Sequence, residues 1–160
     1  MPAQLKLYED FEGYNAYPLQ DAEKIIRTRI GKQVRIMRDE VDKCLSNAKE
    51  HGKEKLVSEI LTLEKRIDRM ITQIEERDRI YVPAYLRERI TQLDEDKLGE
   101  IDSRVENILN KCEETIQQLS CAETDMHIID RFTEINNNLR QMETLCHERS
   151  KLLVKDSAQG

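Results

Sequence analysis

Apolar residues recur at alternating steps of four and three along one segment in the first half of the chain. Charged residues flank this stripe on both sides, which is the pattern of a helix that packs along its length against another helix. The stripe begins at Leu56. Its other members, which we predict to lie in a core or an interface, are Ile60, Leu63, Ile67, Met70 and Ile74.

The same helical period precedes this segment. Apolar residues recur on one helical face between residues 26 and 45. Asp21 stands just before them and is a candidate N-cap, because its carboxylate can accept a hydrogen bond from the first free backbone N–H groups. Gly52 follows them and is suited to a left-handed C-terminal turn. The sequence therefore predicts a first long helix that ends near Gly52.

Two further stripes follow in the second half. One covers residues 97–120, and Asp94 and Asp96 are its candidate caps. The other runs from about residue 124 to residue 154, and residues 155–160 are expected to be a flexible tail. Each stripe is narrow, so none of these helices should be stable alone. They are expected to bury their stripes against one another.

Composition supports this interpretation. Charged residues make up 36% of the chain and aromatic residues only 4%, with five glycines and three prolines, which leaves few hairpin turn signals. We therefore expect an all-α protein. Its predicted architecture is an elongated antiparallel bundle of about four long helices with coiled-coil-like heptad packing, formed as a single unit by residues 21–154.

The first 20 residues form a separate N-terminal arm. They carry most of the aromatic side chains of the chain, namely Tyr8, Phe11, Tyr14 and Tyr17. Rings at this density suit a short helix or an irregular segment that docks on a larger body. A flexible tail is the alternative that the sequence leaves open.

No pattern of residues indicates catalysis or a bound cofactor. The five glycines never cluster into a phosphate-binding loop. A zinc site that uses Cys121, His127, Cys146 and His147 is conceivable, but adjacent residues on a helix point about 100° apart. The cysteines, which also include Cys44 and Cys112, are expected to be reduced thiols. We expect a non-enzymatic protein without a metal or cofactor.

Charge and hydropathy restrict the partners. The net charge is -6, and nearly all the excess acid lies in the second half of the chain. Because nucleic-acid binding depends on cationic groups, little direct contact with DNA or RNA is expected. No run of 18 apolar residues is present and the N-terminus has no leader pattern, so we expect an intracellular soluble protein without membrane insertion.

The stretch EERDRIYVPAYLRERITQLDED, residues 75–96, combines dense charge with two tyrosines and a proline. Pro83 lacks a backbone donor and disfavours helical geometry at the residue before it. We therefore predict a helix break near residues 81–96, with Tyr81 and Tyr85 packed around the joint. A shorter segment would carry the remaining predicted structural or interface residues, Leu86, Arg87 and Arg89.

This stretch resembles the α-helical domain of GINS complex subunits. The resemblance is carried by the pattern E-R-x-R-x5-Y-L-R-x-R-I, formed by Arg77, Arg79, Tyr85, Leu86, Arg87, Arg89 and Ile90. It implies a nuclear scaffold in which four related subunits join the replicative helicase to its partners. It also implies that Tyr85, Leu86 and Ile90 lie in the core of the domain. The four arginines of the pattern would form ion pairs or contacts between subunits. Unlike that family, the chain continues after residue 121 with another predicted helix rather than a β-domain.

A second resemblance lies further along the chain. The run IDSRVENILNKCEETIQQL, residues 101–119, is similar to the N-terminal helical region of endoplasmic-reticulum syntaxins. From the residues alone, we expect a structural subunit or adaptor that binds helical proteins in a hetero-oligomer. The first resemblance would place it in a DNA replication assembly, and the second would make it a regulatory domain or trafficking adaptor in the cytoplasm.

Overall fold

A computed structural model describes residues 4–17, 19–76, 92–119 and 125–159. These residues form one short 3-10 helix and four long α-helices, and no strand occurs among them. The bounds of the elements are η1, Tyr14–Ala16; α1, Leu19–Glu50; α2, Glu54–Glu76; α3, Gln92–Gln118; and α4, Asp125–Gln159. The predicted all-α helical bundle is therefore confirmed.

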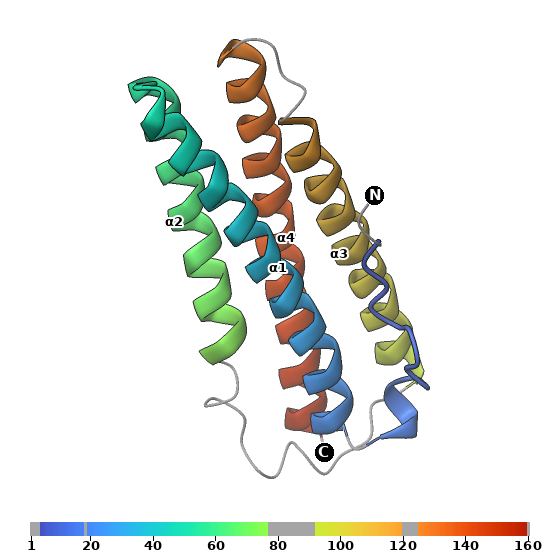
Figure 1. Cartoon of the computed structure of the whole chain (residues 1–160). Helices are drawn as coiled ribbons and strands as arrows, with labels where there is room; N and C mark the ends of the chain where they lie inside the picture. The colour runs from blue at the N-terminus through green and yellow to red at the C-terminus, as the bar shows by residue number, and fades with distance from the viewer. Residues whose placement is uncertain (1–3, 18, 77–91, 120–124, 160) are drawn as a thin grey trace.

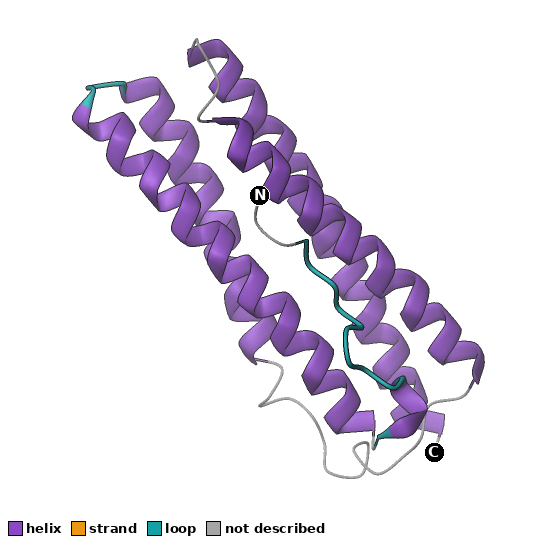
Figure 2. Ribbon diagram, turned by 45° about the vertical axis from the view of Figure 1, so that its right-hand side comes forward, coloured by secondary structure: helices purple, strands orange, loops and turns teal. Residues whose placement is uncertain are grey.

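The helices form two hairpins that lie side by side (Figure 1). α1 packs most extensively against α2, and α3 packs most extensively against α4. The hairpins meet where α2 lies beside α4 and, less closely, where α1 lies beside α3. The N-terminal arm, residues 4–17, runs along the bundle on the side between α1 and α3 (Figure 2). It therefore covers the wider seam of the bundle.

A glycine ends α1 and sets the first hairpin. Gly52 has a φ of 64°, in the left-handed region that glycine adopts without strain. The N–H of Lys53 donates to the carbonyl of Ala48 at 3.1 Å, and the N–H of Gly52 donates to the carbonyl of Lys49 at 3.2 Å. This pair of bonds is a Schellman motif, which satisfies carbonyls at the end of the helix. The predicted end near Gly52 is confirmed.

The predicted helix starts were less accurate. α1 begins at Leu19, so Asp21 lies in its first turn and the prediction of an N-cap there is wrong. α3 begins at Gln92, which also places Asp94 inside the first turn. A carboxylate is favourable at either kind of position, because the partial positive charge of the helix N-terminus extends over the whole first turn. At the other end of the chain, α4 runs to Gln159 and passes the end predicted at residue 154.

The stripe predicted on α2 lies in the core of the bundle. Its members Ile60, Leu63, Ile67, Met70 and Ile74 are all buried, and the first three have no exposed surface. They pack within the chain, in one core to which all four helices contribute. α1 and α2 approach closely near the end of α2, where a Cβ on Gly31 would lie 3.3 Å from Cγ2 of Ile74.

Candidate functional site

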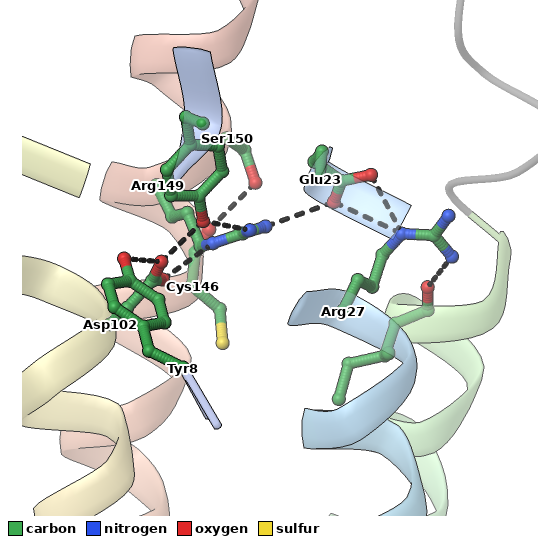
Figure 3. A network of polar contacts seen from close by, with 9 residues as sticks. Tyr8, Glu23, Arg27, Asp102, Cys146, Arg149 and Ser150 are labelled. Carbon is green, nitrogen blue, oxygen red and sulfur yellow. Dashed lines mark hydrogen bonds and ion pairs between the residues drawn. The ribbon is translucent and has the colours of Figure 1, made fainter. Parts of the chain in front are cut away.

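Ion pairs are buried inside one end of the bundle. Arg149 of α4 is 4% exposed. Its Nε donates to Oδ1 of Asp102 in α3 at 2.8 Å, and its Nη1 donates to Oε1 of Glu23 in α1 at 3.0 Å. Its Nη2 donates to the hydroxyl of Tyr14 in the arm at 2.9 Å. One guanidinium thus joins three helices and the arm (Figure 3).

Two further side chains, those of Tyr8 and Arg27, complete what we call the buried ion network, and of these Tyr8 lies at its edge and is 40% exposed. The hydroxyls of Tyr8 and Tyr14 both donate to Oδ2 of Asp102, the former at 2.7 Å. Arg27 donates through Nε to both carboxylate oxygens of Glu23 at 3.1 Å, and through Nη1 to the carbonyl of Ile74 at 3.2 Å. The last contact reaches α2, so every element of the bundle is tied to the network.

The network fixes the protonation states of its two tyrosines and of Arg149. Burial raises the pKa of Tyr8 and of Tyr14, and the Asp102 carboxylate that accepts their hydrogen bonds raises both further. Burial alone would lower the pKa of Arg149, but Tyr14, Asp102 and Glu23 raise it well above its ordinary value. The phenols therefore remain donors and the guanidinium remains charged, which suits a structural role rather than proton transfer.

The arm lies in a groove whose polar walls contact its backbone. We call this the arm groove and define it by Arg29 of α1 and by Asp102, Glu106 and Asn110 of α3. The three α3 residues are spaced four apart, so they lie along one helical face. Leu7 and Tyr14 of the arm are each 1% exposed and are part of the hydrophobic core. The arm is therefore an integral part of the fold.

The aromatic residues of the arm form a cluster. The Tyr8 and Phe11 ring centroids lie 5.1 Å apart, and Phe11 stacks on Tyr17 with centroids 5.5 Å apart. Gly13 has a φ of 105°, and a Cβ there would lie 3.3 Å from Oε1 of Glu95. A glycine is therefore required where the arm turns towards η1 and comes close to α3.

A second groove lies on the outside of the bundle between α3 and α4. Two adjoining hollows of about 350 and 450 Å³ share the residues Arg104 and Glu148 as lining. Apolar side chains from both helices line them, namely Ile101, Ile108, Leu145 and Leu152. The surrounding charges are mixed, with Lys97, Glu100 and Lys151 at one end. We call this the outer groove.

Two pairs of acidic side chains face each other across helix seams. Glu40 of α1 shares a hydrogen bond with Glu113 of α3, and burial together with this bond raises the pKa of Glu40 to about 7. Burial and a hydrogen bond shared with Asp42 of α1 likewise raise the pKa of Glu64 in α2. Each pair can share one proton, so these seams are sensitive to pH.

A further cavity lies beside the buried ion network. Its volume is about 400 Å³, and α1, α2 and α4 all contribute to its lining. Ile30, Met70 and Ile74 form its apolar part, and Arg27 and Arg149 reach it from the network. Both guanidiniums already bond to Glu23, so the network balances their charge.

The sequence-predicted residues are only partly within the described structure. Of the predicted set, the five α2 residues are placed in the core. The predicted helix break near 81–96 lies outside the described residues up to residue 91, and its last part, residues 92–96, is the first turn of α3. The predicted residues Tyr81, Tyr85, Leu86, Arg87 and Arg89 all lie outside the described residues. The same holds for Cys121 of the conceivable zinc site.

The described residues hold neither a metal-ligand cluster nor a disulfide. Among the described residues, no group of three or more His, Cys, Asp or Glu side chains is arranged to hold a metal ion. In the same residues, cysteines 44, 112 and 146 form no disulfide. Burial raises the pKa of Cys112 to about 12, so its thiol is unreactive at neutral pH. No helix in the described part is long and apolar enough to cross a bilayer.

The buried ion network was missed by the sequence reasoning, although a signal for it exists. Asp102 stands between Leu98 and Val105 at the steps of four and three that define the α3 stripe. Arg149 likewise stands between Cys146 and Leu153 in the α4 stripe. A charged residue at a seam position must be paired if the seam is buried. Opposite charges at seam positions of different helices therefore predict such a network.

Comparisons with known proteins give no family for this chain. No protein-family model matches it, and neither a curated protein nor a solved structure matches it.

Proposed function

We propose that the protein is a non-enzymatic helical adaptor, and that it binds an amphipathic helix of another protein in the outer groove. The carrying observation is a hollowed surface between the two helices of one hairpin, with apolar side chains in its lining. Ile101 and Ile108 of α3 lie seven residues apart, as do Leu145 and Leu152 of α4. Two helices that present apolar residues at this spacing can receive a third helix between them.

The stripes first predicted as interfaces cannot serve this purpose. Ile60, Leu63 and Ile67 have no exposed surface, because they pack on helices of the same chain. A partner could reach them only by opening the bundle. In the outer groove, Ile101, Ile108 and Leu145 also belong to the core and are 8%, 9% and 7% exposed, but they line hollows that a partner can enter from outside.

Charge around the outer groove supports a protein partner. Lys97, Arg104 and Lys151 alternate with Glu100 and Glu148 along its rim. A partner helix with opposite charges on its flanks would pair with both signs and be fixed in register. A nucleic acid would meet both carboxylates, which its phosphates repel.

Site-specific photo-crosslinking tests this proposal. A photoreactive residue at Thr144, which lines the outer groove, is expected to capture the partner in the native cell. The same residue at Thr72, exposed on α2, should not capture it. Arg104→Glu should lower the yield at Thr144 by roughly tenfold, equivalent to about 1.4 kcal/mol of binding free energy. Equal capture from both positions would show that the groove is not the site.

A charge-matched control separates local from general effects. Arg131→Glu changes another exposed arginine of the same hairpin, which pairs with Glu134 at 3.5 Å. It should leave the yield at Thr144 unchanged. The identity of the captured protein then distinguishes the two finer proposals: replication factors would support the GINS-like scaffold, and membrane-fusion proteins would support the syntaxin-like regulatory domain.

A further inference from the structure

The arm is bound by side chains of the groove that contact its backbone, as a peptide ligand would be, although its residues 7–10 form turns. The side chain of Asn110 contacts both backbone groups of Leu5: its Oδ1 accepts from the N–H at 2.8 Å, and its Nδ2 donates to the carbonyl at 3.2 Å. Oε1 of Glu106 accepts from the N–H of Leu7 at 2.9 Å. These bonds join groove side chains to arm backbone, so they do not depend on the arm's own covalent attachment.

The opposite wall and the floor of the arm groove complete the recognition. Nη1 of Arg29 donates to the carbonyls of Leu7 and Glu9, at 2.7 and 2.5 Å. The side chains of Leu7 and Tyr14 fill the floor and are almost wholly buried. Asp102 then accepts the hydroxyl hydrogen bonds of Tyr8 and Tyr14. The arm groove thus recognises both backbone and side chains.

We propose that the arm groove is a peptide-binding site in its own right, and that it also accepts the N-terminal arm of a second copy of this chain. The fit to that ligand is already known, because every contact of the arm in its own groove can form again in the groove of another copy. Two copies that exchange arms can form the same contacts between arm and groove that each copy forms alone. The proposal concerns α1 and α3 and is independent of the outer groove.

Tethering determines when exchange occurs. A segment attached to its own site has an effective concentration in the millimolar range, so each copy uses its own arm at low protein concentration. The arm of another copy is favoured when a chain's own arm cannot dock. A pair of complementary defects in full-length chains therefore reveals exchange.

One variant carries a defective arm and the other a defective groove. Leu7→Asp places a charge in the buried floor and leaves the groove intact. Asn110→Ala combined with Arg29→Met removes the backbone contacts made by these two side chains, keeps the one made by Glu106, and leaves the arm intact. Each chain alone should be monomeric, with a loosened arm. In an equimolar mixture, the intact arm of the second chain should enter the intact groove of the first and form a heterodimer.

Trypsin cleavage after Lys6 and light scattering are the measurements. Lys6 is exposed and lies between the two anchored leucines, so its cleavage reports arm docking. Cleavage should be on the order of tenfold faster in each variant than in the wild-type chain. In the mixture, the arm of the groove-defective chain should regain its protection while the scattering mass doubles.

Two outcomes would overturn the proposal. One is a mixture that remains monomeric and unprotected up to about 1 mM, the range of the effective concentration that tethering supplies. The other is dimerisation of Leu7→Asp alone, because that chain has no arm to exchange and would have to associate through another face. If Leu7→Asp lowers helicity, Leu5→Asp replaces it, since Leu5 is only partly buried.

Discussion

The α2 stripe and the buried ion network lie in the same bundle and are almost equally shielded from water. Ile67 has no exposed surface, and Asp102 is 1% exposed. The stripe contributes apolar area, which is favourable in any arrangement that removes it from water. The network contributes bonds of fixed direction between charges that are costly to bury.

This contrast assigns different roles to the two regions. Apolar stripes could pack in several registers, whereas Arg149 can reach Asp102, Glu23 and Tyr14 together in only one. We expect the stripes to supply most of the stability and the network to select the arrangement of the helices and the docked arm. Four changes break or sharpen this comparison.

The largest effect is expected from a charge in the apolar stripe. Ile67→Asp places a carboxylate at a position with no exposed surface in an apolar stripe, so burying the charge, or protonating the group to avoid it, costs free energy. The chain should lose its helical circular dichroism at 25 °C. Ile67→Val, the matched control, should cost only about 0.5–1.5 kcal/mol. A folded Ile67→Asp chain would mean that this face is not core.

The network should respond nearly as strongly to the loss of one member. Arg149→Met leaves Asp102 and Glu23 buried without their shared cation, and we expect a loss of about 3–5 kcal/mol in urea unfolding. Adding Asp102→Asn removes the carboxylate that is left without a cation and should recover part of that loss, whereas Glu23 keeps its pair with Arg27. If the added substitution restores no stability, the packing of the aliphatic part of Arg149 accounts for most of the loss.

An exposed ion pair provides the control for the network. Arg131 of α4 pairs with Glu134 at 3.5 Å, and both side chains are largely exposed. Arg131→Met should change stability by less than about 1 kcal/mol, because water and salt screen such pairs. A loss similar to that of Arg149→Met would contradict the view that burial makes the network important.

The two regions also differ in how far they could be predicted from sequence. The α2 stripe was predictable because each apolar residue at steps of four and three lies on the same helical face. Every further residue of this kind between positions 56 and 74 therefore strengthens the same prediction. The network depends on single residues that meet only in the folded chain. Glu23 and Asp102 are 79 positions apart in the numbering, and a lone acid in a charged helix resembles any solvated one.

The arm shows the same limit. Its four rings predicted docking as one alternative, but not the surface on which they dock. That surface depends on Asn110 and Glu106, whose polar side chains are ordinary for an exposed helical face. Local features were predicted best where one residue suffices, as with Gly52 at the end of α1.

A smaller change in stability is expected from the glycine in the turn after α1, and it gives a reference for the changes in the α2 stripe and in the network. Gly52→Ala forces a side chain into the left-handed region and should cost about 1 kcal/mol. No atom lies within 4 Å of the new Cβ, so backbone strain is the only contribution. Gly99→Ala, inside α3, should be stabilising by up to about 1 kcal/mol in the same thermal or urea assay. Equal signs for the two changes would refute the assigned turn.

The smallest effect should come from the carboxyl pair of Glu40 in α1 and Glu113 in α3, two helices that the buried ion network also joins. Unlike the network, this pair brings together two groups of like charge. Burial and the bond to Glu113 raise the pKa of Glu40 to about 7, while nearby Lys43 lowers it. The folded chain therefore binds a proton that the unfolded chain releases near pH 4.5. Stability from this pair is full below pH 4.5, falls as the pH rises towards 7, and is constant above.

Glu40→Gln tests this pH dependence. The amide can donate to the Glu113 carboxylate at any pH, so the variant should be more stable than the wild-type chain at pH 8 and should lose the slope between pH 4.5 and 7. Glu40 is partly exposed, so solvent screening keeps the gain below that of the glycine changes. Urea unfolding at pH 5 and at pH 8 measures both the gain in stability at pH 8 and the change in stability between the two pH values. A slope that survives the substitution would assign the proton to the Asp42 and Glu64 pair, where burial also raises the pKa of Glu64.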